Sequence, residues 1–207
     1  MEDILDVYHR PYDPDYPLIC MDESCFQMVG EVREPIPMRP GHPVRIDDEY
    51  VRKGIAEIFL AVAPLSGWRL TQVTKRRARV DWAYFMREIS DKCFPNAKKI
   101  VLVMDNLNTH NISSFYKAFP PAEARRLAQR FEIHYTPKHG SWLNIAEIEF
   151  SALKRQCLNR RIETIEEVSS EVAAWQNDRN NRNRKVDWQF DNDSARVQLK
   201  HLYPDLD

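Results

Sequence analysis

The chain has 207 residues, of which 43% are hydrophobic and 29% are charged, as in a soluble globular protein of one domain or of one domain with an appendage. Its apolar runs are far shorter than a membrane span, and its acidic, proline-rich N-terminus lacks the basic start and apolar stretch of a signal peptide, so we expect a cytoplasmic protein. The net charge of −1 neither favours nor excludes nucleic acid as a partner, although several short basic clusters are present.

The first fifty residues predict one short strand between two irregular segments. Residues 1–16 contain prolines and predict an irregular arm. The apolar run 18–21 predicts a central strand that ends at Asp22. Residues 26–53 contain four prolines, which predict an irregular insertion, or at best a poor edge hairpin.

The middle of the chain predicts a meander followed by a helix and a buried strand. Two apolar or β-branched runs, 55–64 and 68–75, flank a turn that contains glycine and predict two antiparallel strands. Apolar residues at helical spacing predict a helix over 79–94. The five apolar residues 100–104 predict a buried strand that ends at Asp105.

The remaining elements are mostly helical. A helix is predicted around 122–130, after two prolines, and a short alternating strand over 131–136. Ser141 is a reasonable N-cap for a helix that runs to about residue 158. Thr164 begins a capping box for the last long helix, and residues 191–200 predict a short final helix.

The order β-β-β-α-β-α-β-α predicts an α/β fold, a ribonuclease-H-like mixed sheet with helices on both faces and a C-terminal helical extension. We assign residues 17–160 to this domain and residues 161–207 to the extension packed on it. In such a fold the first and fourth strands lie side by side, which brings Asp22 and Asp105 together. Either acid could instead be an ordinary turn residue after a strand.

A third acid near the start of a helix would complete a site of oxygen ligands for a hard divalent cation. Two candidates, Glu147 and Glu149, lie on opposite shoulders of the apolar stripe of the predicted helix. Periodicity does not choose between them, and either could be an ordinary solvent-facing acid.

Three strings in the sequence carry a resemblance to a known family: MDES at Asp22, VMDNLNTH at Asp105 and YTPKHGSWLNIAEIEF before the third acid. They resemble the DDE transposases of bacterial insertion sequences in the mariner superfamily. The pattern Leu-Asn-Pro-x-Glu of that superfamily matches the segment from Leu143 to Glu147, which favours Glu147 over Glu149. Ile145 replaces the proline, and the segment between the second and third acids is longer than is usual.

The resemblance implies a magnesium-dependent DNA transposase or endonuclease, with Asp22, Asp105 and Glu147 as catalytic and metal-binding residues. It implies two Mg²⁺ ions per site, for which Mn²⁺ may substitute, and phosphoryl transfer that cleaves DNA and then joins strands at insertion-sequence ends. Further polar residues near the acids, and one at the end of the same helix, are candidate DNA contacts: Asn106, Asn108, His110, Lys138, His139 and Arg155. For the three that follow Asp105, a polar strand-to-helix loop is an equally good interpretation.

The partners implied are transposon-end and target DNA, a second copy of the chain in a homodimer, and an upstream helix-turn-helix domain for which this chain has no room. We accordingly expect the chain at the nucleoid. Two alternatives stay open: a ribonuclease-H-like endonuclease that only hydrolyses DNA, and a repurposed domain that binds DNA without catalysis.

Overall fold

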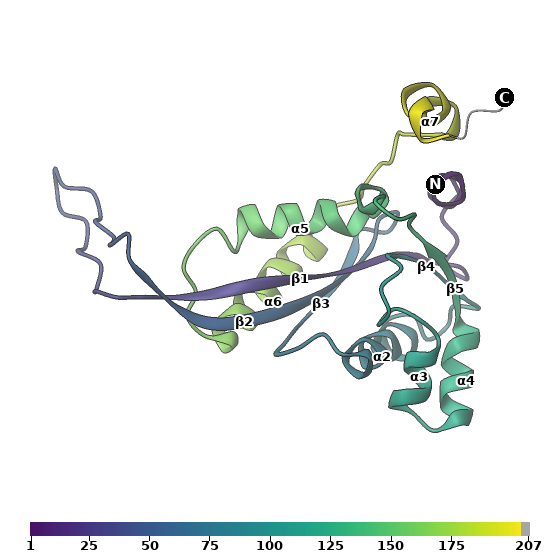
Figure 1. Ribbon diagram of the computed structural model, residues 1–207, viewed down its shortest axis with the longest axis horizontal. Helices are drawn as coiled ribbons and strands as arrows, with labels where there is room; N and C mark the ends of the chain where they lie inside the picture. Colours follow the sequence, from purple (N-terminus) through teal and green to yellow (C-terminus); the bar gives the residue numbers. More distant parts are fainter. Residues whose placement is uncertain (204–207) are drawn as a thin grey trace.

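A single five-stranded mixed sheet forms the centre of the computed structural model, which describes residues 1–203 (Figure 1). The strand order is β3-β2-β1-β4-β5. The strands are β1 (Leu18–Glu31), β2 (Tyr50–Ala63), β3 (Trp68–Thr74), β4 (Ile100–Met104) and β5 (Phe131–Tyr135).

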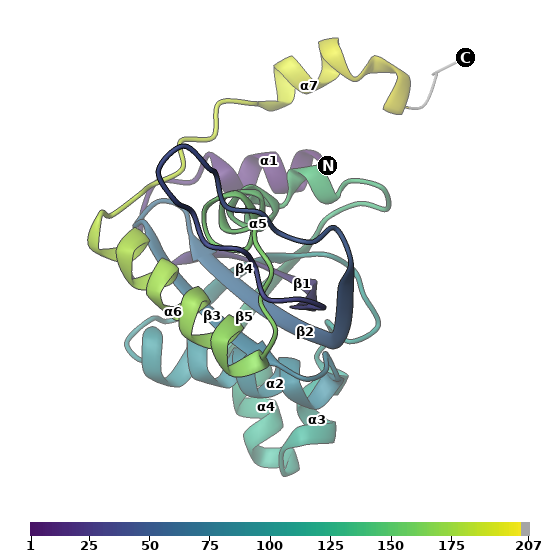
Figure 2. The ribbon, with the colours of Figure 1, turned by 90° about the vertical axis from the view of Figure 1, so that its left-hand side faces the viewer.

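Helices cover both faces of the sheet, as predicted (Figure 2). Helices α2, α3 and α4 pack on one face, and α1, α5 and α6 on the other. The α-helices are α1 (Glu2–Tyr8), α2 (Arg79–Glu88), α3 (Ser113–Ala118), α4 (Pro121–Arg130), α5 (Ile145–Gln156), α6 (Ile165–Asn181) and α7 (Asn192–Gln198). The short helical turns are η1 (Ile89–Cys93), η2 (Ser141–Leu143) and η3 (Lys200–Leu202). None of the helices within residues 1–203 has both the length and the apolar character needed to cross a bilayer.

The first and fourth strands are neighbours, which confirms the predicted plan. β1 pairs in parallel with β4 from Leu18 to Cys20. The prediction that the first strand ends at Asp22 was wrong, since β1 continues to Glu31 through antiparallel pairing with β2. Asp22 therefore lies just beyond the end of the β1–β4 pairing, beside the point where β4 ends and Asp105 begins the next loop.

Much of the predicted irregular insertion is regular structure. Residues 26–31 and 50–53 belong to β1 and β2, which continue past the rest of the sheet as a two-stranded ribbon (Figure 1). All four prolines fall within residues 32–49, the connection at the tip of this ribbon. The flanking segments lack proline and keep their backbone N–H groups for pairing, which is why they remain in strands.

The N-terminal arm was also predicted wrongly, because it contains helix α1. The first proline of the chain is Pro11, beyond the end of this helix. Ile4, Leu5, Val7 and Tyr8 are buried in the core on the α5 side of the sheet. The Tyr8 hydroxyl donates a hydrogen bond of 2.6 Å to the carbonyl of Leu143, which ties α1 to the turn before α5.

Three details near the helix termini complete the comparison. α3 was not predicted, and Asn144 rather than Ser141 caps α5, because residues 141–143 form the separate turn η2. The predicted cap of α6 is confirmed, since Thr164 Oγ1 accepts a 3.2 Å hydrogen bond from the Glu167 backbone. The extension packs on the sheet through α6, whereas the end of its predicted range, residues 204–207, lies outside the described residues.

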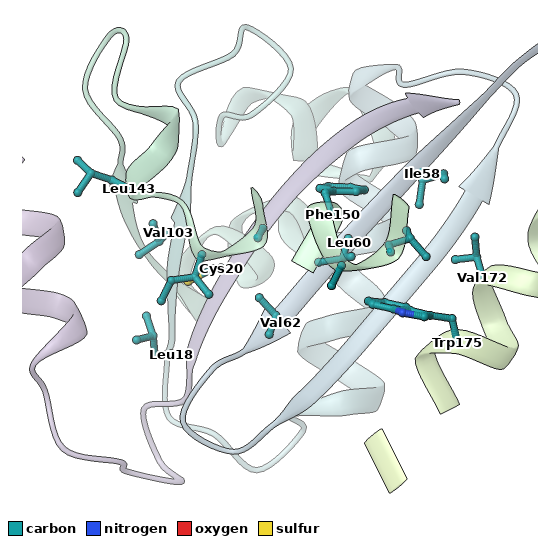
Figure 3. Close-up of a cluster of buried hydrophobic side chains, with 14 of the residues drawn as sticks. Leu18, Cys20, Ile58, Leu60, Val62, Val103, Leu143, Phe150, Val172 and Trp175 are labelled. Atoms are coloured by element: carbon teal, nitrogen blue, oxygen red, sulfur yellow. The ribbon is translucent and has the colours of Figure 1, made fainter. Parts of the chain in front are cut away.

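Alternation along β1 sends its side chains to two separate cores. Leu18 and Cys20 belong to the core cluster on the α5 side, where Figure 3 shows them beside Val103, whereas Ile19 and Met21 belong to the cluster on the α2 side. The same alternation directs Asp22 to the α5 face and the next residue to the α2 face. Adjacent acids at this end of the sheet therefore have different surroundings.

Candidate active site

Asp22 is a nearly buried carboxylic acid, with a relative exposure of 9%. Burial raises the pKa of Asp22 to about 7, and the negative charges of Asp105 and Glu147 add to this effect. A 2.7 Å hydrogen bond from the Glu23 backbone N–H to Asp22 Oδ1 opposes the shift without cancelling it. The charge of His110 also lowers the pKa of Asp22, but by less, and no ion pair engages the Asp22 carboxyl within residues 1–203.

Asp105 follows the last residue of β4, and its side chain is 29% exposed. Its Oδ1 contacts Nδ1 of His110, a fully buried residue of the loop that leads to α3. The other ring nitrogen of His110, Nε2, lies 3.0 Å from Oε1 of Glu23. Burial alone would lower the pKa of His110, but the contacts with Asp105 and Glu23 outweigh it and raise the pKa to about 9.

Helical periodicity did not show which of Glu147 and Glu149 is the third acid, but the surroundings of the two side chains differ completely. Glu147 is exposed in the first turn of α5. Glu149 is 1% exposed, and both of its oxygens accept hydrogen bonds of 2.7 Å from the buried Arg69. Arg179 adds a third bond of 2.8 Å. Burial would raise the pKa of Glu149, but the two guanidinium groups outweigh it and lower that pKa.

Glu149 is thus a structural acid that joins α5 to β3 and α6, and its oxygens are already occupied. Glu147 has no such partner: no hydrogen bond or ion pair engages its side chain within residues 1–203. The geometry therefore favours Glu147 as the third acid of the site, in agreement with its position three residues after Asn144.

Asn144 attaches the start of α5 to the strand that carries Asp22. Its Nδ2 donates a 2.9 Å hydrogen bond to the carbonyl of Met21, and its Oδ1 caps the helix through the N–H of Ala146 at 3.2 Å. Asn144 is fully buried. One side chain therefore fixes the first turn of α5, and with it Glu147, beside the end of the β1–β4 pairing.

The chemistry of the three acids fits a hard divalent cation. All the donors are carboxylate oxygens, and the repulsion that raises the pKa of Asp22 is the kind that a bound cation relieves. Within residues 1–203, however, no three acidic, histidine or cysteine side chains converge closely enough to be ready-made ligands of a single ion. The three acids interact through their charges, as the raised pKa of Asp22 shows, but they do not form a ready-made ligand set.

A cavity of about 440 Å³ adjoins Asp105 and contains several of the predicted DNA contacts. Asn106, Lys138 and His139 line it together with Asp105. Lys138 and His139 are exposed, and His139 has a positive φ of 66° in the tight loop after β5. This arrangement provides a cationic side chain next to the acids, where the backbone of a nucleic acid would need one.

The other three predicted DNA contacts lie elsewhere. Asn108 is exposed on the loop after Asp105 but does not line the cavity. Arg155 lines a different cavity at the far end of α5, about 12 Å along the helix from Glu147 at 1.5 Å per residue. The prediction that His110 contacts DNA was wrong, because its ring is fully buried between two acids.

Several residues of the site were missed by the sequence analysis. Glu23 is one of them, although strand alternation beside Asp22 could have placed it on the opposite face of the sheet. The pairing of Arg69 with Glu149 joins residues eighty positions apart, and no local pattern indicates it. Tyr8 was missed because the segment that carries it was predicted to be irregular.

Comparison with known proteins agrees with this geometry. The chain matches the family described as DDE superfamily endonuclease over residues 17–169. No curated protein sequence matches it.

Solved structures of Mos1 share the fold. The Mos1 strand transfer complex has a TM-score of 0.58 and 13% identity over 85% of this chain and 51% of that one. The Mos1 paired-end complex with the left transposon end has a TM-score of 0.58 and 14% identity, over 85% and 52% of the two chains. The Mos1 mariner paired-end complex with Mn has a TM-score of 0.55 and 16% identity, over 86% and 52%.

The chain spans about half the length of the Mos1 chains that it matches. At these identities the likeness establishes the ribonuclease-H-like fold, as predicted, while the family match covers the strands, α5 and all three acids. The chain is therefore a member of the DDE superfamily endonucleases.

Proposed function

We propose that this chain is the catalytic domain of a DNA transposase that cleaves DNA at insertion-sequence ends and transfers the cut strand to target DNA. The observation that carries the proposal is that the buried carboxyl of Asp22, just beyond the β1–β4 pairing, is close enough to Asp105 and Glu147 for both of their charges to raise its pKa. The endonuclease family supports the cleavage step. The Mos1 structures, described as strand transfer and paired-end complexes, support the joining step by analogy of fold.

In this proposal Asp22, Asp105 and Glu147 hold two Mg²⁺ ions, for which Mn²⁺ substitutes. When bound, such ions supply Lewis-acid activation of the attacking hydroxyl or water and stabilise the leaving oxygen at phosphorus. The carboxylates are suited to this role because they bind hard cations through oxygen, and a bound cation would favour the ionised form of Asp22, whose pKa is raised by burial and by the charges of the other two acids.

The remaining residues of the site bind and orient. Lys138, exposed beside Asp105, places a positive charge where a DNA phosphate has to approach the acids. Asn144 keeps Glu147 in place by attaching its helix to β1. Arg155 is too far along α5 to share this phosphate, and we propose for it only a peripheral contact with the DNA backbone.

Further parts of the proposal concern the assembly. We infer that the partners are transposon ends and target DNA, that two copies of the chain act together, and that a helix-turn-helix domain outside this chain recognises the ends. A cytoplasmic location at the nucleoid follows from a DNA substrate.

The first test is nicking of a supercoiled plasmid in Mg²⁺ by the wild type and by Asp22→Asn, Asp105→Asn and Glu147→Gln. Each of the three substitutions is expected to abolish nicking. The matched control is Glu166→Gln, since Glu166 is also an exposed acid in the first turn of a helix, and it should nick like the wild type. Nicking that persists in any of the three variants removes that residue from the proposed site.

A second assay separates transfer from hydrolysis. An oligonucleotide with a pre-cut 3′-hydroxyl end is incubated with target plasmid and Mg²⁺, and joined product is measured. Joined product supports the transposase. Nicking without joining favours the endonuclease that only hydrolyses DNA, and binding of DNA with neither activity favours the repurposed domain.

A further inference from the structure

His110 is the most tightly enclosed ionisable group near the site, and the proposed reaction assigns it no role. Its ring is fully buried, and each ring nitrogen contacts a carboxylate, Asp105 on one side and Glu23 on the other. Glu23 lies in β1, and Asp105 directly follows the neighbouring strand β4. His110 therefore bridges the residue that follows β4 and the middle of β1, on the face of the sheet opposite Asp22 and α5.

The surroundings hold the imidazole in one orientation. The ring of Trp82 from α2 stacks on it, with centroids 6.0 Å apart and planes inclined by 29°. The Tyr135 hydroxyl donates a 2.9 Å hydrogen bond to the His110 carbonyl, and the His110 N–H donates one of 2.9 Å to the Leu107 carbonyl. Backbone and ring are thus both fixed, so the direction from which Nδ1 meets Asp105 is fixed as well.

The bridge leaves the two oxygens of Asp105 unequal. Oδ1 contacts His110, whereas Oδ2 has no hydrogen-bond partner among residues 1–203. The carboxylate is 29% exposed and lines the cavity that contains Lys138. A carboxylate held by one oxygen and open at the other is oriented for a ligand on its open side, in the manner of the outer-shell partners that orient metal ligands.

Glu23 completes the bridge. Its side chain is 1% exposed, and its Oε2 is buried without a hydrogen-bond partner. Such a group is costly to bury, and the contact with His110 is the one interaction of its carboxylate that the described residues provide. A purely structural role would be served better by a nonpolar pair of the same size.

We propose that His110 is the positioning residue of Asp105: anchored by Glu23 through Nε2, it holds Oδ1 through Nδ1 and presents Oδ2 to a divalent cation. His110 does not touch the cation or the DNA. The inference rests on the proposed function, because it assumes that Asp105 binds metal.

The test compares two amides that replace different nitrogens of the ring. An Asn at position 110 places its amide nitrogen near the position of Nδ1 and can still hold Asp105, whereas a Gln places it near Nε2 and cannot. Both substitutions, His110→Asn and His110→Gln, are made together with Glu23→Gln, so that neither leaves an unpaired buried carboxylate. The protein with Glu23→Gln alone is the reference.

Mn²⁺ affinity is measured without DNA from the electron paramagnetic resonance signal of the free ion, and folding is checked by circular dichroism in EDTA. The Gln variant is expected to bind Mn²⁺ about tenfold more weakly than the reference, a typical loss for a missing outer-shell partner. The Asn variant should bind it as the reference does. Equal affinity in both variants, or an equal loss in both, overturns the proposal.

Nuclear magnetic resonance of the wild type provides a measurement that does not depend on the folding of variants. With ¹⁵N-labelled histidine, the Nδ1 proton of His110 should remain hydrogen-bonded and protected from exchange before and after addition of Mg²⁺. Rapid exchange of the Nδ1 proton upon Mg²⁺ addition shows that the imidazole releases Asp105, and this overturns the inference. Absence of Mn²⁺ binding by the wild type refutes the proposed function itself, and the inference with it, whereas intact wild-type binding with indistinguishable variants refutes the inference alone.

Discussion

Replacing Asp22 with Asn is expected to stabilise the metal-free protein at pH 8. Burial, followed by the charges of Asp105 and Glu147, raises the pKa of Asp22 from 3.8 to about 7. Above that pH the folded protein holds a buried carboxylate that the unfolded chain exposes to water. Asn has nearly the same size, keeps an oxygen for the Glu23 N–H, and removes the charge.

The magnitude follows from the shift in pKa. Because the pKa is higher in the folded than in the unfolded state, the folded protein binds more protons between about pH 4 and pH 7, and stability falls as the pH rises through that range. At about 1.4 kcal/mol per pKa unit, the loss reaches at most roughly 4 kcal/mol by pH 8. Relaxation around the site reduces this limit, and we expect the Asp22→Asn protein to be about 2 kcal/mol more stable at pH 8.

The assay is urea unfolding followed by circular dichroism in EDTA, at pH 4.5 and at pH 8. The gain in the free energy of unfolding should be small at pH 4.5 and large at pH 8, whereas Asp48→Asn, at an exposed acid in the tip of the ribbon, should show no such difference. Addition of Mg²⁺ at pH 8 should stabilise the wild type but not the variant. Equal stability of the wild type and Asp22→Asn at both pH values would refute the reasoning.

Three further changes test the supports of the site, each measured by urea unfolding. Glu149→Ala leaves Arg69 buried without its bidentate partner and should lower the free energy of unfolding by about 3–5 kcal/mol. Glu147→Ala, on the exposed face of the same helix, should change it by less than about 0.5 kcal/mol. Equal losses of stability would contradict the different roles of these two acids. Asn144→Ala removes the N-cap of α5 and the hydrogen bond to β1, and should lower the free energy of unfolding by about 1–3 kcal/mol. An unchanged urea midpoint would show that other contacts hold the helix. Leu5→Ala in the buried face of α1 should cost about 2–5 kcal/mol if this helix is part of the core, and a negligible effect would restore the interpretation of an irregular arm.

The parts of the fold that sequence reasoning predicted are those governed by continuous apolar runs. Residues 100–104 form a strand buried along its whole length, and five apolar residues in succession indicate this directly. The neighbouring position of β1 and β4 followed from the order of elements. The extent of β1 did not, because beyond Asp22 the strand is held by pairing with β2, and its sequence there is mostly polar or exposed.

The candidate site was predictable in its acids but not in its supports. Asp22 and Asp105 terminate apolar runs, and that signal is local. The distinction between Glu147 and Glu149 depends on Arg69 and Arg179, which pair with Glu149. Both arginines belong to other elements, so the periodicity of the helix sequence gives no information about them. The burial of His110 has the same origin, since a polar loop sequence does not reveal that α2 places Trp82 against the ring.

The most direct test of the central claim is anomalous diffraction from crystals of this chain grown with Mn²⁺. The account predicts anomalous peaks at about 2.0–2.2 Å from carboxylate oxygens of Asp22, Asp105 and Glu147, a distance expected for hard divalent ions, with Glu149 still bound to Arg69. Crystals of the Asp22→Asn protein should lack these peaks. Mn²⁺ bound elsewhere, or no ordered Mn²⁺ between the three acids at saturating concentration, would contradict the assignment of this site.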